Sequence, residues 1–530
     1  QKGDVYKGNS PAFSPPNPFS FSLSMIYWVY VTRFPGEWKR LCAENPSDRI
    51  LFCGMKYLAS IRYKRYEEVF EMEENEKIVL FEKASIPSAV AKLSVPMIFS
   101  SLVMVLYNMA DTYFVGMLNN PVENAAVSLA APVLLAFNAI NNLFGVGTSS
   151  MMSRALGRKD YEVVSESSAF GFYCSLICGV LFGLLCGLFH GPLLTLIGAD
   201  ETTRAATQGY MFWTVYLGAA PSILNVVMAY LVRSEGAALH ASIGTMSGCI
   251  LNMILDPIFI LPWGFHMGAA GAGLATCISN CVACLYFFVL LYVKRGNTFV
   301  CINPKKFRIK RQIIREVCGV GIPASIQNLL NVTGMTVLNN FTSAYGADAV
   351  AAMGIAYKIY MVPMQVAMGF SQGIMPLVSY NFASGNRRRM KDTILFALKL
   401  IVPVLAVVTV LYYINAGRLI SLFMNNEAII AYGTRFLHGF GLGICFISVD
   451  FLAVGVFQAL GFGRYALLFA VMRKLILEIP ALLILNMIFP LYGLAYAQCT
   501  AEFILCICAI LMLRHIFRTY QDTKEYASSH

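Results

Sequence analysis

Long apolar stretches recur along the whole sequence, and they restrict the possible folds more than any other feature. A bilayer core is about 30 Å thick, and a helix needs about 20 apolar residues to cross it because every backbone amide must be paired within the lipid. Of the 530 residues, 57% are hydrophobic and 13% are charged, against about 25% charged in soluble proteins, which excludes a single soluble domain. The sequence therefore predicts an all-α integral membrane protein. Its twelve transmembrane helices are expected near residues 93–117, 125–152, 165–189, 205–232, 240–262, 268–293, 317–343, 349–380, 392–414, 429–460, 466–489 and 493–513.

Lysine and arginine are distributed unevenly between the connections. One set of alternate connections carries most of them, including Arg154, Arg233 and residues 387–389, whereas the other set carries only Arg204 and Arg418. Because positive charge collects on the cytoplasmic side, we predict a multi-pass protein of the plasma (inner) membrane with both termini in the cytoplasm. The net charge of +11 is thus explained by topology, and a nucleic-acid partner, which would need a basic groove-sized face, is not expected.

The longest basic stretch, residues 294–315, divides the spans into two sets of six, and the two sets resemble each other. The tripeptides at 94–96 and 321–323 both end in Pro and are 227 residues apart, and the segments at 155–158 and 383–386 are 228 apart. Since six is even, both halves have the same orientation and form a parallel internal repeat. We expect an N-terminal six-helix bundle (72–293), a basic cytoplasmic linker (294–316), a C-terminal six-helix bundle (317–516) and a cytoplasmic tail (517–530).

Residues 1–71 specify no fold. Prolines alternate there with Ser, Asn and Phe, and the apolar patch at 19–30 is too short to span a membrane. No small-residue cleavage site of a signal peptide follows it. We expect this segment to be disordered or a non-native extension, with the functional protein beginning near Met72.

Two acids stand inside predicted spans, where a charge costs several kcal/mol and each needs an explanation. Asp111 is the only charged residue between 93 and 118, and Asp256 is the only one between 241 and 262. Both lie about 24–27 Å from the cytoplasmic face at 1.5 Å per residue, in the outer half of the membrane. A purely structural role, such as a helix cap, is the alternative for either acid alone. Two acids at a matched depth favour a functional site.

Polar side chains accompany each acid at helical spacing. Tyr107 precedes Asp111 by one turn, and Asn252 precedes Asp256 by one turn, so each helix has one polar face. Burial and a neighbouring carboxylate favour the protonated form, whereas a cation would bind the ionised forms. We therefore expect these acids to couple transport to an ion.

Prolines lie near both acids and are expected to act as hinges. Pro96 lies in the first span, and Pro257 directly follows the second acid. Proline removes a backbone donor and clashes with the preceding turn, so a helix can bend at these positions.

The second half of the chain lacks this pair, because the repeat places Leu338 and Ala481 opposite the two acids. Its best candidate is Asp450, which lies in an apolar run. Arg473 and Lys474 are expected to reach toward the cytoplasmic interface. Lys474 is also expected to form an intrahelical pair with Glu478. The ion site is thus predicted to be one-sided, and the role of Lys358 stays open.

Three motifs resemble the multidrug and toxic compound extrusion (MATE) family: MADTYFVG at 109–116, LNMILDP at 251–257 and GIMPLVSYN at 373–381. The resemblance extends from residue 72 to about residue 515. It implies a transporter of two six-helix bundles that exports organic, often cationic and amphipathic compounds in exchange for protons or sodium ions by alternating access. No cofactor besides the coupling ion is implied.

Position by position, the resemblance implies an ion-coupling site in the first bundle. It contains Asp111, Tyr107, Asn252, Asp256, a sixth-span hydroxyl at Thr276 and a fourth-span amide at Asn225, with Pro96 as the bending proline. Asp450 resembles a tenth-span acid of another branch, but residues 328–333 lack the seventh-span glutamate of that branch. The bacterial subgroup with a first-lobe ion site therefore fits better.

A flippase, an enzyme or a scaffold would each require residues that differ from those in this sequence. A flippase for lipid-linked saccharides would have Arg or Lys in its cavity, and none lies deep in the first six spans. An enzyme would need a catalytic grouping such as H-E-x-x-H or a P-loop, and a scaffold would not need acids inside its spans. Cys281 and Cys284 form a C-x-x-C without further ligands, so no metal site is expected. The partners expected are small organic substrates and the bilayer, with a monomer favoured.

Overall fold

The structure is a computed structural model and describes residues 77–520, except 119 and 425. The expectations for residues 1–71, and for the tail beyond residue 520, fall outside this range. Within it, the regular structure consists of helices, and twelve consecutive helical segments match the twelve predicted spans. The all-α fold class is confirmed.

Six helical segments form the N-terminal bundle, here called the N-lobe (residues 77–293). They are α4 (Ile86–Gly116); α5, η1 and α6 (Pro121–Asn141, Asn142–Val146, Gly147–Gly157); α7 with the short α8 (Tyr161–Leu188, His190–Leu196); α9, η2 and α10 (Arg204–Met211, Phe212–Leu217, Ala219–Ser234); α11 (Ala238–Ile260); and α12 (Gly268–Val293). Two of these segments contain a stretch of π-helix, η1 and η2, which the sequence did not indicate.

Six more segments form the C-terminal bundle, the C-lobe (residues 311–520). They are α13 (Arg311–Ser343), α14 (Ala347–Ala383), α15 (Arg387–Ser421), α16 (Glu427–Ala459), the broken segment α17, η4 and α18 (Gly463–Val471, Met472–Glu478, Ile479–Ile488), and α19 (Gly493–Thr519). α13 and α15 begin earlier than predicted because polar and charged residues continue these helices beyond the apolar stretch.

Among the described helices, nine are long and apolar enough to cross a membrane, and a bent pair of helices makes a tenth. That pair, residues 204–217 and 219–234, bends by 49°. The other two segments, α13 and residues 463–488, contain polar or charged side chains along their length. Such side chains are tolerated within a membrane when they face the interior of the bundle.

The helices begin and end where the sequence supplies caps. The side chain of Asn120 accepts a hydrogen bond from Val122 N at the start of α5, and Asn426 does the same for α16, which satisfies amides that have no intrahelical partner. Gly236 follows α10 and Gly461 follows α16, the fourth segments of the two lobes, and their φ angles are 91° and 81°. A glycine is favoured at such a position, and the pair repeats at 225 residues in the sequence.

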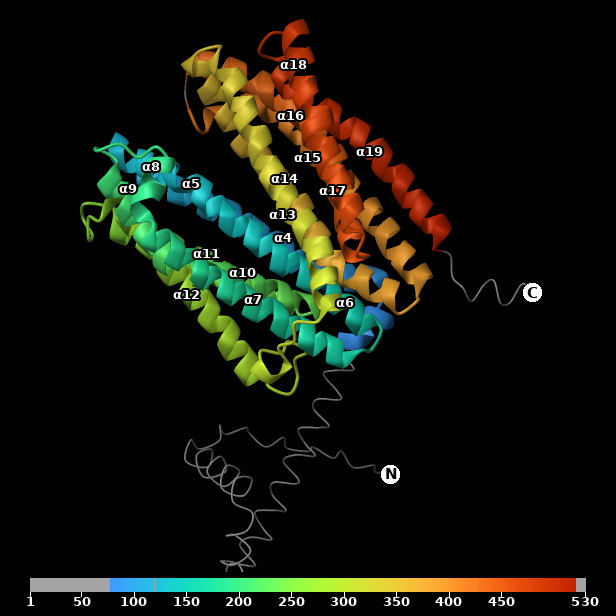
Figure 1. Cartoon of the computed structure of the whole chain (residues 1–530). Coiled ribbons are helices and arrows are strands. Elements are labelled where there is room, and N and C mark those ends of the chain that lie inside the picture. The colour runs from blue at the N-terminus through green and yellow to red at the C-terminus, as the bar shows by residue number, and fades with distance from the viewer. Residues whose placement is uncertain (1–76, 119, 425, 521–530) are drawn as a thin grey trace, which may run out of the picture. The chain divides into compact units, whose positions relative to one another are not determined.

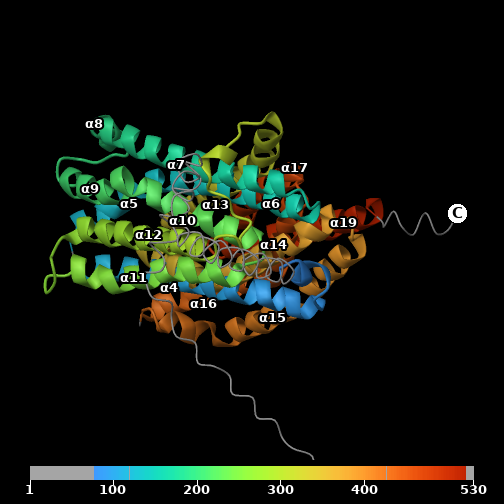
Figure 2. The same cartoon turned by 90° about the horizontal axis from the view of Figure 1, so that it is seen from below.

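The two lobes contact each other through equivalent helices. α4 packs against α14, and α13 packs against η1 and α6, so the first segment of each lobe meets the second segment of the other. Glycines allow this close approach: a Cβ on Gly373 would lie 2.6 Å from Ser94 Cα, and one on Gly321 would lie 2.0 Å from Leu143 O. Figure 1 shows the N-lobe helices α9–α12 on one side and the C-lobe helices α14, α17 and α19 on the other, and in Figure 2 α9, α11 and α12 lie to the left and α17 and α19 to the right.

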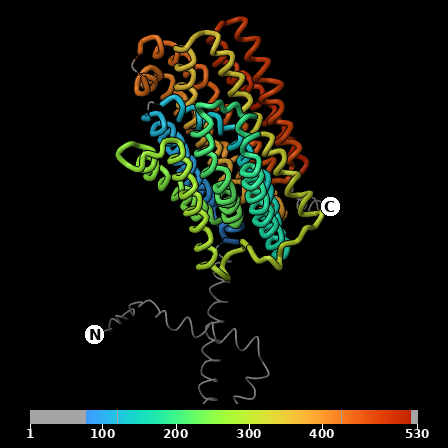
Figure 3. The backbone as a smooth tube through the Cα atoms, turned by 60° about the vertical axis from the view of Figure 1, so that its left-hand side comes forward, coloured from blue at the N-terminus to red at the C-terminus, as the bar shows by residue number. Residues whose placement is uncertain are grey.

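The connection between the lobes, residues 294–310, runs along one end of the molecule (Figure 3). It packs against α7, where Cys301 N donates to Ser168 Oγ at 3.0 Å and Lys310 Nζ lies 2.6 Å from Glu166. The basic linker is therefore held against the N-lobe. The lobes meet near α6 at this end and diverge toward α8 and α18 (Figure 1).

Candidate functional site

Asp256 and Asn252 form the buried centre of the predicted ion site. Both face inward from α11 and are 0% and 2% exposed. With its amide nitrogen toward the carboxylate, Asn252 donates to Asp256 Oδ2 at 2.8 Å, and its oxygen accepts from the backbone N and the hydroxyl of Thr276 at 3.1 and 3.2 Å. This amide orientation is assigned from the partners, each of which it satisfies. Thr276 lies on α12, so the network joins two helices.

Asp111 and Tyr107 reach the same network from α4. The Tyr107 side chain interacts with both Asp111 and Thr276, and Asp111 lies close enough to Asp256 for their charges to interact. α4 is also joined to α11 about three turns before the acids, where Ser100 and Thr245 share a hydrogen bond of 2.7 Å. The structure thus brings together the two acids that the sequence placed at a matched depth.

The packing of α11 on α12 depends on small residues. A Cβ on Gly244 would overlap the ring of Phe287, and one on Gly248 would lie 3.2 Å from Ala283 Cβ. Close approach through small residues is the usual way in which helices associate in membranes. It sets Thr276 opposite Asn252.

Tyr210 is a member of this site that the sequence analysis missed. It lies on α9, is 6% exposed, and faces both Asp111 and Asp256. Its segment contains a π-helical stretch, η2, and bends by 49° between residues 217 and 219, and no local pattern in the sequence indicates either feature. The only available signal was the polar character of the surrounding residues, such as Thr207 and Gln208.

The remaining predicted residues of the N-lobe lie apart from the acids. Asn225 on α10 donates to Asn280 Oδ1 on α12 at 3.3 Å. Among the described interactions it contacts neither acid, so its predicted place in the network is not supported. Pro96 lies inside α4, which continues through it without a break, and Pro257 lies one turn before the end of α11.

Asp450 belongs to a different arrangement in the C-lobe, a cluster of five buried ionisable residues. Arg473 Nε donates to Glu502 Oε1 at 2.8 Å, and Lys474 Nζ lies 2.5 Å from Glu478. The cluster links α16, η4 and α19. We had expected Arg473 and Lys474 to reach the interface, and this was wrong, because both are 6% exposed. The intrahelical pair of Lys474 and Glu478 is present as expected.

Asp450 lies against Glu502, and a hydrogen bond between these two carboxyl groups requires a proton on one of them. Among the described residues, no other group donates to Asp450 or to Glu502 Oε2. The two ion pairs use both cations, and Asp450 interacts with Glu502 and Arg473 of the first pair. Lys358, whose role was open, is exposed.

Contacts between the lobes gather at the end where α6 lies, here called the closed end. Arg154 Nη2 lies 3.3 Å from Glu316 Oε2 across the lobes. Arg389 Nε donates to Phe81 O at 2.7 Å, and the Tyr380 hydroxyl donates to Glu82 at 2.7 Å. A set of charge-assisted hydrogen bonds therefore holds this end shut.

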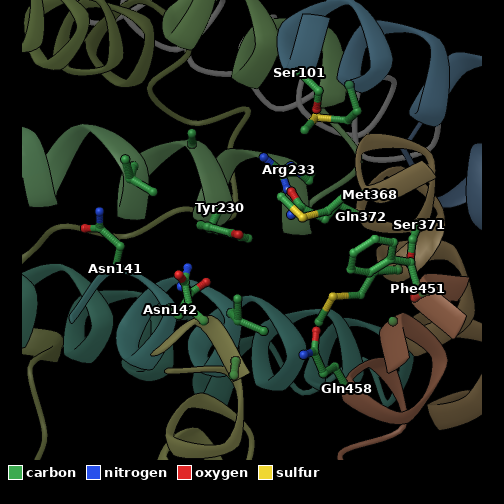
Figure 4. Close-up of a pocket in the computed structure, with 18 of the residues that line it drawn as sticks. Ser101, Asn141, Asn142, Tyr230, Arg233, Met368, Ser371, Gln372, Phe451 and Gln458 are labelled. Atoms are coloured by element: carbon green, nitrogen blue, oxygen red, sulfur yellow. Dashed lines mark hydrogen bonds between the residues drawn. The ribbon is translucent and has the colours of Figure 1, made fainter. Parts of the chain in front are cut away.

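A central cavity of about 310 Å³ lies between the lobes above the closed end. α4, α5, η1, α10 and α11 line it from the N-lobe, and α13, α14 and α16 line it from the C-lobe. Figure 4 shows its polar side chains, which include Asn141, Asn142, Gln372 and Gln458. Asp111 and Asp256 are not among the lining residues, so the acid site and the cavity are separate places that share α4 and α11.

Comparisons with known proteins identify close relatives. The sequence model of the MatE family matches residues 96–258 and, 227 residues later, 323–484, in agreement with the internal repeat. The multidrug export protein MepA of Staphylococcus saprophyticus is 34% identical over 440 residues, which cover 83% of this chain and 96% of that protein. MepA of Staphylococcus aureus is 32% identical over 445 residues, covering 84% and 97%.

A solved structure described as the outward-facing conformation of a multidrug resistance MATE family transporter of the MOP superfamily matches the fold with a TM-score of 0.79. The two sequences are 26% identical, and the match covers 84% of this chain and 98% of that one. The two-lobe arrangement of twelve helices is therefore shared.

Proposed function

The chain belongs to the MatE family of multidrug efflux transporters, and on this basis we propose that it is a secondary active antiporter. It exports organic, often cationic and amphipathic, compounds in exchange for protons or sodium ions. The two lobes rock about the central cavity so that substrate has access to one side of the membrane at a time.

The observation that carries the proposal is the group of two acids on neighbouring helices. Asp111 and Asp256 lie near each other without a described cationic partner, among the amide of Asn252 and the hydroxyls of Tyr107 and Thr276. Carboxylate, amide and hydroxyl oxygens can hold a sodium ion, and two close carboxyl groups can hold a proton between them. Both coupling ions fit this set, and no other cofactor is proposed.

The two helices that contribute to both the acid site and the cavity, α4 and α11, can couple ion binding to substrate binding. α4 contributes Met97 and Ser101 to the cavity and Asp111 to the acid site, and α11 contributes Thr245 and Asp256 in the same way. A change at the acids that moves either helix changes the cavity wall. Pro96 lies within the contact of α4 with α14, between Ser94, which approaches Gly373, and Met97, which approaches Gly369. As a proline inside a helix it is the proposed point of bending.

The closed end carries the basic connections, so by the distribution of positive charge it is the cytoplasmic end. We propose that the structure is the outward-facing state, with both termini cytoplasmic and the protein in the plasma (inner) membrane. Likeness to a solved outward-facing relative supports this.

Asp450 remains the candidate for a second ion site. Its position against the carboxyl group of Glu502 supports that role, because two close carboxyl groups can share a proton. Residues 328–333 of α13 contribute no acid.

Purified protein in liposomes tests the proposal. An imposed proton or sodium gradient should drive accumulation of a fluorescent organic cation, and the matching ion should move in the opposite direction. Dye accumulation that does not change with either the proton or the sodium gradient would contradict antiport. Transport of a lipid-linked phosphate in place of the dye would favour the alternative, a flippase for lipid-linked saccharides.

A further inference from the structure

Arg233 is a buried arginine whose side chain reaches the central cavity at its closed end. It lies in the last turn of α10, is 6% exposed and lines the cavity. Its Nη1 donates to Gln372 Oε1 on α14 at 2.8 Å, and its guanidinium lies 4.7 Å from the centre of the Tyr230 ring. Figure 4 shows these side chains together at the cavity wall. From the sequence alone, Arg233 is one of the basic residues that mark the cytoplasmic connections.

The charge of Arg233 has no anionic partner among the described residues. Arg154 and Arg473, which are also buried, pair with Glu316 and Glu502. Arg233 has only the neutral Gln372 and Tyr230, and its Nε has no hydrogen-bond partner. A buried ion without a counter-ion is costly unless something else compensates it. The site is therefore short of one negative charge and one hydrogen-bond acceptor.

The rest of the cavity contains no group that would bind a cation by charge. Its described lining includes Asn and Gln amides, serine hydroxyls, methionines and aromatic rings, but no Asp, Glu, Lys or His, and Arg233 is its single charged residue. Asn141 Oδ1 is a further buried atom without a partner. Amides can donate to an anion and accept from a neutral group, whereas methionines adapt to apolar parts of varied shape.

We propose that the closed end of the central cavity is a subsite for one carboxylate group of an amphipathic substrate, with Arg233 as the residue that determines this specificity. The inference rests on the proposed function and narrows its substrates from organic cations in general to compounds that carry a carboxylate, zwitterions included. A guanidinium presents a planar fork that matches a carboxylate, and this guanidinium lines the cavity without an anionic partner among the described residues. The cavity volume is in the range of drug-sized ligands.

A phosphate group would satisfy this subsite less well. A phosphate monoester carries a charge of about −1.5 to −2 near neutral pH, and the cavity offers only one cation. The second charge would be buried without a partner. A carboxylate leaves no charge unmatched.

The structural alternative is that Arg233 merely helps to close the lobes through Gln372. Loss of that link would change the rate of opening for every substrate alike. A carboxylate subsite instead changes the preference between two substrates that differ only in that group. Selectivity therefore separates the two roles.

The test is a binding measurement on the full chain in lipid nanodiscs, with one xanthene dye as its free carboxylate and as its ethyl ester, and with a phosphate monoester of similar size. The wild-type protein should bind the carboxylate about tenfold to a hundredfold more tightly than the ester, as expected for a hydrogen bond between charged groups. The phosphate should bind more weakly than the carboxylate. Arg233→Gln should remove the preference, and Arg233→Lys should retain part of it.

The matched control is Arg154→Gln, at a buried arginine that pairs with Glu316 and does not line the cavity. It should leave the ratio of the two dissociation constants unchanged. Equal binding of ester and carboxylate by the wild type, tighter binding of the phosphate, or an unchanged ratio in Arg233→Gln would overturn the proposal, and the wild-type result stands even if a variant fails to fold. Ion-driven transport of the ester alone would refute the subsite but leave antiport intact.

Discussion

The two lobes share a fold, but they bury acids in different ways. In the N-lobe, Asp111 and Asp256 are surrounded by hydroxyls and an amide. In the C-lobe, Glu478 and Glu502 are each paired with a cation. A paired charge is fixed, since breaking the pair leaves the other charge buried and unpaired. An acid with only neutral partners can gain or lose a proton, or bind a cation, at a smaller cost. The C-lobe cluster is therefore structural, whereas the N-lobe site can change its protonation or its bound cation during transport.

The largest effect should follow from breaking the C-lobe pair. Glu502→Gln leaves Arg473 charged and buried, so the free energy of unfolding should fall by about 3–5 kcal/mol, measured as a lower melting temperature in detergent. Glu427→Gln, at an exposed glutamate in the first turn of α16, is the matched control and should have little effect. If Glu502→Gln is as stable as the control, the cluster is not the structural unit described here.

The N-lobe acids should show the opposite pattern. Asp256→Asn or Asp111→Asn removes an acid that has no cation partner, so the folded protein should keep its melting temperature. Ion-driven accumulation of dye in liposomes should fall by at least about a hundredfold, because differential ion binding of about 2.7 kcal/mol or more is lost. Asp348→Asn, at an exposed acid in the first turn of α14, should transport normally. Full uphill transport by both variants would contradict the assignment.

A smaller effect is expected from the neutral members of the acid site. Thr276→Val removes the hydroxyl that contacts Asn252 and Tyr107, which should weaken ion binding by about threefold to tenfold, the contribution of one hydrogen bond. The ion concentration that gives half-maximal transport should rise accordingly. Thr500→Val, which removes an exposed hydroxyl bonded only to its own helix, serves as the control. Identical ion dependence in both variants would remove Thr276 from the site.

Asp450 should give the smallest change in stability. Because the hydrogen-bonding partner of Asp450 is the carboxyl group of Glu502, Asp450→Asn keeps a donor toward Glu502, and the free energy of unfolding should change by less than about 1 kcal/mol. A loss as large as that of Glu502→Gln would show that Asp450 carries a charge that balances Arg473. A loss of ion-driven transport at normal stability would instead place a second ion site in the C-lobe.

The features that the sequence predicted are those encoded locally. Each apolar stretch reports lipid exposure along one helix, so the twelve segments and the repeat could be read directly. The depth of Asp111 and Asp256 also follows from counting residues along two helices that start at the same face. The two acids are close to each other because α4 and α11 are neighbouring helices.

The features that were missed depend on contacts between distant segments. Tyr210 lies near acids on two other helices, in a segment that bends by 49° after a π-helical stretch. Arg473 was expected at the interface because its position was judged from the nearest helix end, whereas Glu502, on another helix, holds it inside. The cavity position of Arg233 likewise depends on α14 of the other lobe. Hydropathy along one helix contains none of this information.

The most direct test of the account measures the dissociation constant (Kd) of a transported dye as a function of pH and of sodium concentration, in the wild type and in Asp256→Asn. If the acids exchange the ion for substrate, raising the coupling ion should weaken dye binding to the wild type by about 5- to 150-fold, the range of typical coupling energies. The Kd of Asp256→Asn should stay constant over the same range. A wild-type Kd that responds to neither ion, or an equal response in the variant, would contradict the central claim.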